Sequence, residues 1–180
     1  MSNSQKRLII AVFGLLLLCL TGPWSYDAFG IIPISVQSLW VILLPVISGW
    51  FGVIAVALYV LLGLSGLPVF SDHSSGWLKL QGPSGGFLIG FILISAAVVF
   101  YLKRNPVQSD PLRCFILFAV SHLLLLMMGF LWMFVILEDA LEVIGTLILV
   151  LSPGLVLKSF LGAALSKIIY DHLLIGPSDE

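Results

Sequence analysis

Long apolar segments separated by short polar ones dominate this sequence and limit what it can fold into. Hydrophobic residues make up 60% of the 180 positions, and charged residues only 9%. A soluble domain is about 25% charged, so this chain has too few polar side chains to cover a surface that faces water. Lipid must therefore be its solvent for most of its length. The length suits one domain, which we expect to span residues 1–180.

The apolar segments predict an all-α membrane protein, a bundle of about six transmembrane helices, since a span needs about 20 apolar residues. The expected helices cover residues 8–26, 36–47, 51–67, 87–102, 115–137 and 153–173. The first resembles a signal peptide but lacks a small-x-small cleavage site, so we expect it to be retained. The second is short and must tilt or use flanking residues. Residues 138–151 start with acids and end in leucines, which suits an interfacial helix or an extension of a neighbour.

The charges indicate how such a bundle is oriented. Lys and Arg close to membrane ends stay on the cytoplasmic side. If both termini are cytoplasmic, six of the eight basic residues lie inside: Lys6, Arg7, Lys103, Arg104, Arg113 and Lys167. The acids near the helix ends, among them Asp72 and Glu138, then lie outside. The pattern predicts a multi-pass protein of the cell membrane with its longer loops, and its function, on the outer side.

Small residues recur every three or four positions in two segments, as expected for helices that pack closely in lipid. One stripe comprises Gly52, Ala55, Tyr59, Gly63 and Gly66, and the other comprises Gly154, Lys158, Gly162 and Ser166. Lys158 therefore faces the protein interior. Ionisable residues within a membrane mark ligand or ion paths, which predicts an anionic partner such as a carboxylate. The alternative is a lysine that extends to the headgroups.

A glycine-rich segment, Gly82-Pro83-Ser84-Gly85-Gly86, immediately precedes an apolar helix. Free backbone amides at such a position suit an oxygen-bearing or anionic ligand. A tight turn between helices that needs glycine is the alternative interpretation.

The remaining polar residues give little support to catalysis. His122 lies within an apolar helix, where a hydrogen-bonded packing role is commoner than a proton relay. Neither Asp72-His73 nor Asp171-His172 completes a metal site. No nucleophile–base set and no ATP-binding motif is present, and the net charge of −1 gives no sign of nucleic acid. We therefore expect no catalytic residue, metal or cofactor.

Several motifs, in order and spacing, resemble the BioY family, the biotin-binding S components of energy-coupling-factor (ECF) transporters. They are residues 33–38 (PISVQS), 66–70 (GLPVF), 82–86 (GPSGG), Gly129 with Trp132, and Pro153-Gly154 with Lys158. The resemblance implies a six-helix subunit of the bacterial plasma membrane that captures biotin from outside. Its partners would be a membrane-coupling T subunit and two cytoplasmic ATPases, with lipid around it.

The resemblance also implies a set of ligand contacts. The biotin carboxylate would meet Lys158, the ureido ring would meet polar groups, and the apolar thiophane and chain would meet aromatic side chains. The expected ligand-binding residues are Gln37, Trp77, Ser84, Gly85, Gly86, Phe87, Trp132 and Lys158.

Two positions depart from the family pattern. Leu155 stands where the family has an aspartate in Pro-Gly-Asp-x-x-Lys, and Phe87 replaces a tyrosine after the paired glycines. Both changes remove a polar group that could contact the ligand, so the predicted ligand is biotin or a related small carboxylic acid. The alternative hypotheses are a small intramembrane enzyme acting on lipid, with His122 or the outer acids as acid–base groups, and a membrane scaffold protein.

Overall fold

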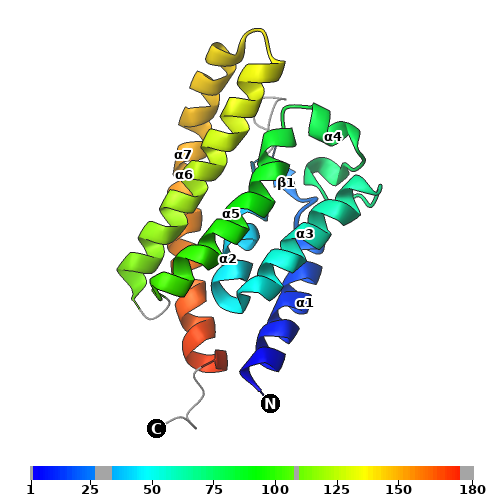
Figure 1. Cartoon of the computed structure of the whole chain (residues 1–180). Helices are drawn as coiled ribbons and strands as arrows, with labels where there is room; N and C mark the ends of the chain where they lie inside the picture. The colour runs from blue at the N-terminus through cyan, green and yellow to red at the C-terminus, as the bar shows by residue number, and fades with distance from the viewer. Residues whose placement is uncertain (1, 27–33, 108–109, 175–180) are drawn as a thin grey trace.

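The computed structural model describes residues 2–26, 34–107 and 110–174. The predicted all-α membrane bundle is confirmed (Figure 1). Its principal helices are α1 (Asn3–Thr21), α2 (Gln37–Ser48), α3 (Trp50–Leu64), α5 (Gly85–Arg104), α6 (Pro111–Ile136) and α7 (Ala140–Ile169). The shorter elements are β1 (Ser25–Tyr26) paired antiparallel with β2 (Ile34–Ser35), a 3-10 turn (Ser71–His73), α4 (Leu78–Gln81) and a π-helical turn (Tyr170–Leu174).

Local interactions move some helix ends away from the expected positions. α1 begins at Asn3 because Ser2 and Gln5 form a capping box, in which each side chain accepts a hydrogen bond from the other's backbone N–H. α7 begins at Ala140 and continues through Pro153. Most of the segment 138–151 is therefore an extension of the last helix, one of the two options that the sequence left open.

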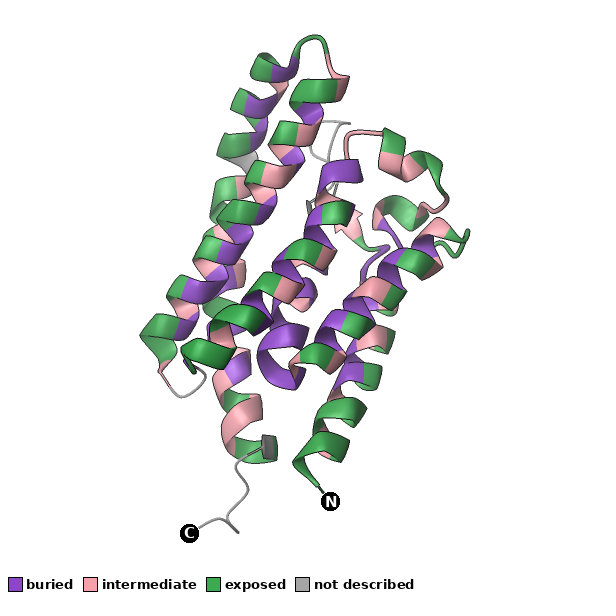
Figure 2. Cartoon of the chain, viewed as in Figure 1, coloured by how far each residue is buried: buried purple, intermediate pink, exposed green. Residues whose placement is uncertain are grey.

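By length and composition, four helices in the described residues can cross a membrane: α1, α5, α6 and residues Leu151–Leu173. α2 and α3 are apolar but shorter. α2 occupies the centre of the bundle, where it packs against α1, α3, α5 and α7, and Figure 2 shows it buried on nearly every side. A central helix needs no lipid-facing surface of its own, which is why a 12-residue helix suffices here.

Two glycines bring α2 and α3 together. Gly49 connects them with a φ of 63°, a left-handed conformation that glycine adopts without strain. Gly52 lies so close to the α2 backbone at Leu44 and Pro45 that a Cβ there would collide with it. The expected stripe on α3 therefore packs inward, except that Gly66 lies beyond the end of the helix.

The stripe on α7 is only partly interior. A Cβ on Gly162 would collide with the ring of Phe118 on α6, and Ser166 is fully buried. A Cβ on Gly154 would meet no atom of the described residues within 4 Å, so this glycine is not a packing contact. This part of the prediction was wrong, because the space beside Gly154 is open.

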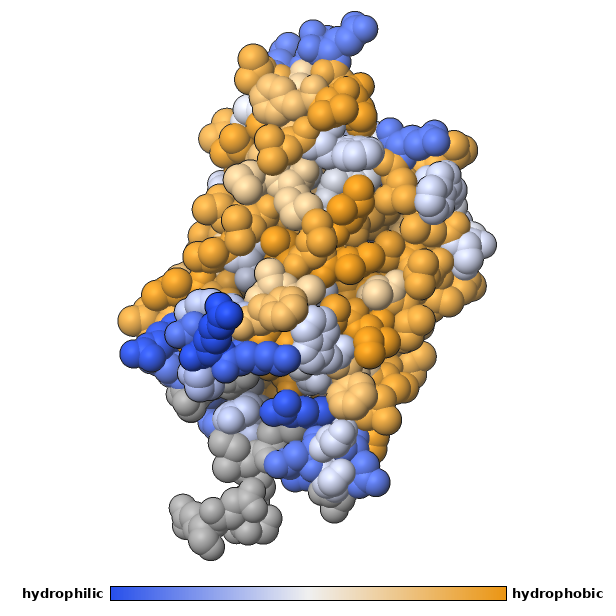
Figure 3. All heavy atoms as spheres, viewed as in Figure 1, coloured by the Kyte–Doolittle hydropathy of each residue, from blue (hydrophilic) through white to orange (hydrophobic). Residues whose placement is uncertain are grey.

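The surface of the bundle is largely apolar, as contact with lipid requires. Figure 3 shows apolar side chains across the middle of one face and charged ones gathered at its two ends. Large apolar residues such as Phe13, Leu61 and Leu131 are exposed around the bundle. We name the end that carries the N-terminus and the α5–α6 connection the terminal end. The opposite end, which carries residues 65–84 and the α6–α7 connection, is the loop end (Figure 1).

Tyr59 connects α3 to the loop that follows it. Its hydroxyl donates to the Val69 carbonyl at 2.8 Å, and its ring packs edge-on against Phe70. Tyr59→Phe removes the hydrogen bond, keeps the ring, and leaves a buried carbonyl without its partner. We expect the free energy of unfolding to fall by about 1–2 kcal/mol, seen as a lower Tm in detergent. An unchanged Tm would show that this bond does not stabilise the loop.

Candidate functional site

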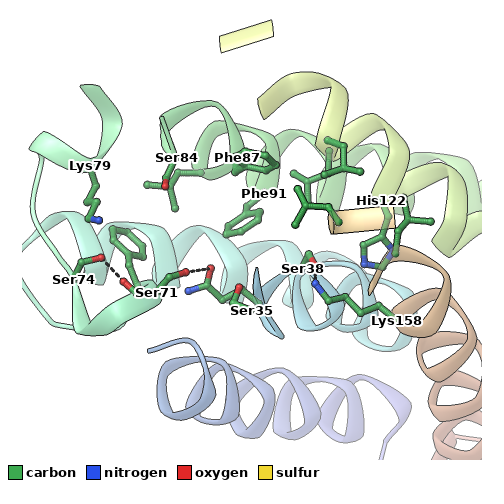
Figure 4. Close-up of a pocket in the computed structure, with 17 residues that line it drawn as sticks. Ser35, Ser38, Ser71, Ser74, Lys79, Ser84, Phe87, Phe91, His122 and Lys158 are labelled. Carbon is green, nitrogen blue, oxygen red and sulfur yellow. Dashed lines mark hydrogen bonds between the residues drawn. The ribbon is translucent and has the colours of Figure 1, made fainter. Parts of the chain in front are cut away.

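A pocket lies at the loop end between α2, α5, α6, α7 and the segment that follows α3 (Figure 4). The hollow comprises about 850 Å³ when the open solvent at its mouth is counted. Its lining comprises Ser35, Gln37, Ser38, Phe70, Ser71, Ser74, Lys79, Ser84, Phe87, Leu88, Phe91, His122, Leu125, Leu126, Leu151, Leu155 and Lys158.

The lining has a simple chemical layout. Two lysines, Lys79 and Lys158, contribute the cationic groups, and Figure 4 shows them at opposite ends of the pocket. Phe87 and Phe91 lie between them and provide apolar wall. No carboxylate belongs to the described lining, so an anionic ligand would meet no acidic side chain there.

Lys158 projects from α7 into the pocket and not into lipid. Its Nζ donates to Ser38 Oγ on α2 at 3.1 Å, and the side chain is partly buried. The contact joins two helices that are far apart in sequence, and it holds the ammonium at the pocket wall. The ammonium has three hydrogens, so further donors remain available for a ligand.

Gln37, at the first position of α2, is 5% exposed, and both polar atoms of its amide are hydrogen-bonded. Its Nε2 donates to the Gly22 carbonyl at 3.0 Å, and its Oε1 accepts from Ser71 Oγ at 3.3 Å. Ser74 Oγ in turn donates to the Ser71 carbonyl at 2.6 Å. The hydrogen bonds of Gln37 therefore link the central helix to the end of α1 and to the loop after α3. These links define this wall of the pocket.

The start of α5 brings two further expected residues, Ser84 and Phe87, to the pocket. The glycines between them serve another purpose in this structure. A Cβ on Gly85 would collide with the Leu80 carbonyl, and one on Gly86 would collide with Trp132. These contacts require glycine for close packing. They differ from the alternative interpretation, a tight turn that needs glycine dihedrals, because Gly85 and Gly86 lie within α5 and are not among the described glycines with a positive φ.

The other expected residues lie outside the lining. Trp132 packs over the paired glycines and donates through Nε1 to the Gly82 carbonyl at 3.1 Å. Trp77 is 63% exposed. Thus Gln37, Ser84, Phe87 and Lys158 come together at the pocket, whereas Trp77, Gly85, Gly86 and Trp132 do not line it. Ligand contact by any of the eight stays a prediction.

Sequence reasoning missed several lining residues: Ser35, Ser38, Ser71, Ser74, Lys79 and Phe91. Short polar residues in turns are common, so the serines carry no signal of their own. Lys79 could have been found, because in the predicted topology it is one of the few basic residues on the outer side.

His122 on α6 also lines the pocket, although its expected role was packing. Its Nδ1 lies 2.9 Å from the Phe118 carbonyl and 3.3 Å from Ser159 Oγ. Its Nε2 is buried and has no hydrogen-bond partner within the part of the chain that the structure describes. Among the described residues, no group of three or more His, Cys, Asp or Glu could hold a metal ion.

Comparisons with known proteins agree with this architecture. Biotin transporter BioY2 of Lactococcus lactis is 33% identical over 135 residues, which cover 74% of this chain and 72% of that protein. Biotin transporter BioY of Thermotoga maritima is 44% identical over 77 residues, which cover 42% of this chain and 46% of that protein.

A solved structure supports the fold. The crystal structure of the S-component for biotin from an ECF-type ABC transporter superposes with a TM-score of 0.85 at 24% identity, over 96% of this chain and 95% of that one. The sequence also matches the BioY family over residues 1–174. The predicted resemblance is confirmed, and the chain belongs to the BioY family.

Proposed function

We propose that this protein captures biotin for uptake across the membrane, as the substrate-binding subunit of an ECF-type transporter. The observation that carries the proposal is a pocket with apolar walls and a lysine towards each end, in a chain of the BioY family. Biotin is an elongated molecule with a carboxylate at one end, a ureido ring at the other and an apolar thiophane and chain between. That sequence of groups matches the polar–apolar–polar layout of the pocket.

The other two hypotheses lack comparable support. A lipid-modifying enzyme would need an acid–base set that meets in one place. His122 lies at the pocket, but the outer acids do not join it, because the described lining contains no carboxylate. A scaffold protein would not need a pocket with two lysines. The relatives named above are transporters.

The sequence has no ATP-binding motif, so uphill transport must draw its energy from another subunit or from an ion gradient. We propose that a membrane-coupling T subunit and two cytoplasmic ATPases supply it. The basic side chains of Lys103, Arg104 and Arg113 lie at the terminal end, which favours a cytoplasmic location for that end and for both termini. The pocket, at the loop end, would then receive biotin from outside a bacterial plasma membrane.

Calorimetric titration of the detergent-purified chain with biotin and with biotin methyl ester tests the proposal. We expect saturable binding of biotin and weaker binding of the ester, because esterification removes the negative charge that a lysine would bind. Absence of binding to either compound would overturn biotin as the ligand, and other small carboxylic acids would be titrated next.

A further inference from the structure

The terminal end of the bundle carries positive charge that no acid compensates. Among the described residues, the acids at this end are Asp110 and Asp171. Asp110 pairs with Arg113 at 3.2 Å, and Asp171 pairs with Lys167 at 3.0 Å. Four basic residues of this end form no ion pair within the described part of the chain: Lys6, Arg7, Lys103 and Arg104.

Two of these cations flank the connection between α2 and α3. α3 packs against both α1 and α5, and Figure 1 shows it between them. From α5, Lys103 Nζ lies 5.4 Å from the centre of the ring of Trp50, the first residue of α3. From α1, Arg7 Nη1 lies 3.8 Å from the position of a Cβ built on Gly49, the residue before Trp50. Three helices therefore bring two cationic groups to one exposed place.

Aromatic rings hold the Lys103 ammonium in position and leave its charge available. Nζ lies 6.0 Å from the centre of the Phe100 ring, and Phe100 packs edge-on against Trp50 with 5.2 Å between the ring centres. A ring attracts a cation through its quadrupole but does not neutralise the charge. The ammonium has three N–H donors. An anion with several oxygens, such as a phosphate, suits this group.

The surroundings indicate that such a phosphate belongs to a lipid. Trp50 and Phe100 are themselves exposed, and exposed apolar side chains continue from them along both helices, Ile54 and Leu58 on α3 and Leu93 on α5. Tryptophan beside lysine or arginine is typical of the level of the lipid headgroups. Basic groups between membrane helices bind anionic headgroups. A soluble phosphate ester would use only the cations, whereas a phospholipid also covers the apolar side chains.

We propose that Arg7, Trp50, Phe100 and Lys103, the Trp50 cluster, bind the headgroup of an anionic phospholipid. Its phosphate accepts hydrogen bonds from Lys103 and Arg7, and an acyl chain lies along the exposed faces of α3 and α5. The cluster is at the opposite end of the bundle from the pocket, so the inference does not rest on the proposed function. A lipid held here would fix how deeply the terminal end sits in the membrane.

Native mass spectrometry of the detergent-purified full chain tests this site with equimolar phosphatidylglycerol and phosphatidylcholine of identical acyl chains. We expect wild type to retain phosphatidylglycerol preferentially. Lys103→Met and Arg7→Met should each lower that preference about fivefold, the contribution of one cation close to an anionic surface. Lys103→Arg keeps a cation over the Trp50 ring and should stay within about twofold of wild type.

Arg113→Met is the matched control that separates a defined site from the overall charge of the terminal end. It removes one positive charge from the same end, but Arg113 lies on α6 and pairs with Asp110, outside the Trp50 cluster. We expect it to change the preference by less than about twofold. An equal loss in Arg113→Met and Lys103→Met would overturn the proposal, because the preference would then follow net charge.

Glycerophosphoglycerol, the deacylated headgroup, distinguishes a lipid from a soluble phosphate ester in the same experiment. We expect it to leave bound phosphatidylglycerol in place at equal concentration, because it has no chain to cover α3 and α5. Displacement would overturn the assignment to a lipid. Equal retention of phosphatidylglycerol and phosphatidylcholine by wild type would overturn the site itself.

Discussion

Replacing Lys158 with methionine is expected to lower biotin affinity at least tenfold, which is about 1.4 kcal/mol of binding free energy. Hydrogen bonds from a charged donor are about twice as strong as neutral ones, and the site is partly shielded from water. Methionine fills the space of the lysine stem, so packing of α7 against α2 should survive the change. The loss therefore reports the ammonium itself, whichever oxygen of biotin it binds.

Titration calorimetry of the variant beside wild type measures this loss, and Lys103→Met provides the matched control. Lys103 lies at the far end of α5, where its Nζ sits 5.4 Å from the centre of the Trp50 ring. The control removes one positive charge without touching the pocket, so it should bind biotin like wild type. If Lys158→Met also bound normally, the lysine would have no contact with the ligand.

Most of the helices could be predicted from the sequence, because a lipid environment restricts which segments can span it. A membrane-spanning helix must be long and apolar, and that signal is strong in α1, α5 and α6. Features set by local contacts were not decided by this signal: the capping box at Ser2 was not predicted, and the continuation of α7 through Pro153 was one of two options. Neither depends on hydrophobicity, which was the signal that defined the segments.

The pocket was harder to predict, because it is assembled from elements distant in sequence. Lys158 stood out because a charge inside an apolar helix is rare. Ser38, its hydrogen-bond partner, is 120 positions away and has an ordinary residue type. His122 was visible as a polar residue within α6. The orientation of its ring follows from the contacts of Nδ1 with Phe118 and Ser159, which a sequence does not reveal.

The glycine-rich motif shows how a correct signal can have more than one physical meaning. Residues 82–86 were singled out for free amides at a helix start. In the structure the paired glycines are buried beneath Trp132 of α6, and the Leu80 carbonyl of α4 lies against Gly85. The motif is still essential to the pocket, because it sets the positions of Ser84 and Phe87. The glycines act on the ligand site through packing.

That packing role leads to the second large expected effect, from Gly86→Ala. The added methyl group would lie 2.7 Å from the Met128 carbonyl oxygen and against the Trp132 side chain, so α5 must shift away from α6. Overpacking of this kind typically costs about 1–3 kcal/mol. Because Phe87 is the next residue and lines the pocket, we expect the Tm to fall and biotin affinity to drop at least about tenfold.

Gly154→Ala is the control for this prediction because it makes the same chemical change in a different environment. Gly154 lies within α7, and a Cβ there has no neighbour within 4 Å. Alanine favours a helix over glycine by about 1 kcal/mol, so this variant should be as stable as wild type or more so, with unchanged biotin binding. The same helix preference acts at Gly86 and opposes the expected loss, so a lower Tm there must come from the collision with α6. If thermal unfolding and biotin titration gave the same result for both variants, close packing of α5 on α6 would not be what shapes the pocket, and the paired glycines would need another explanation.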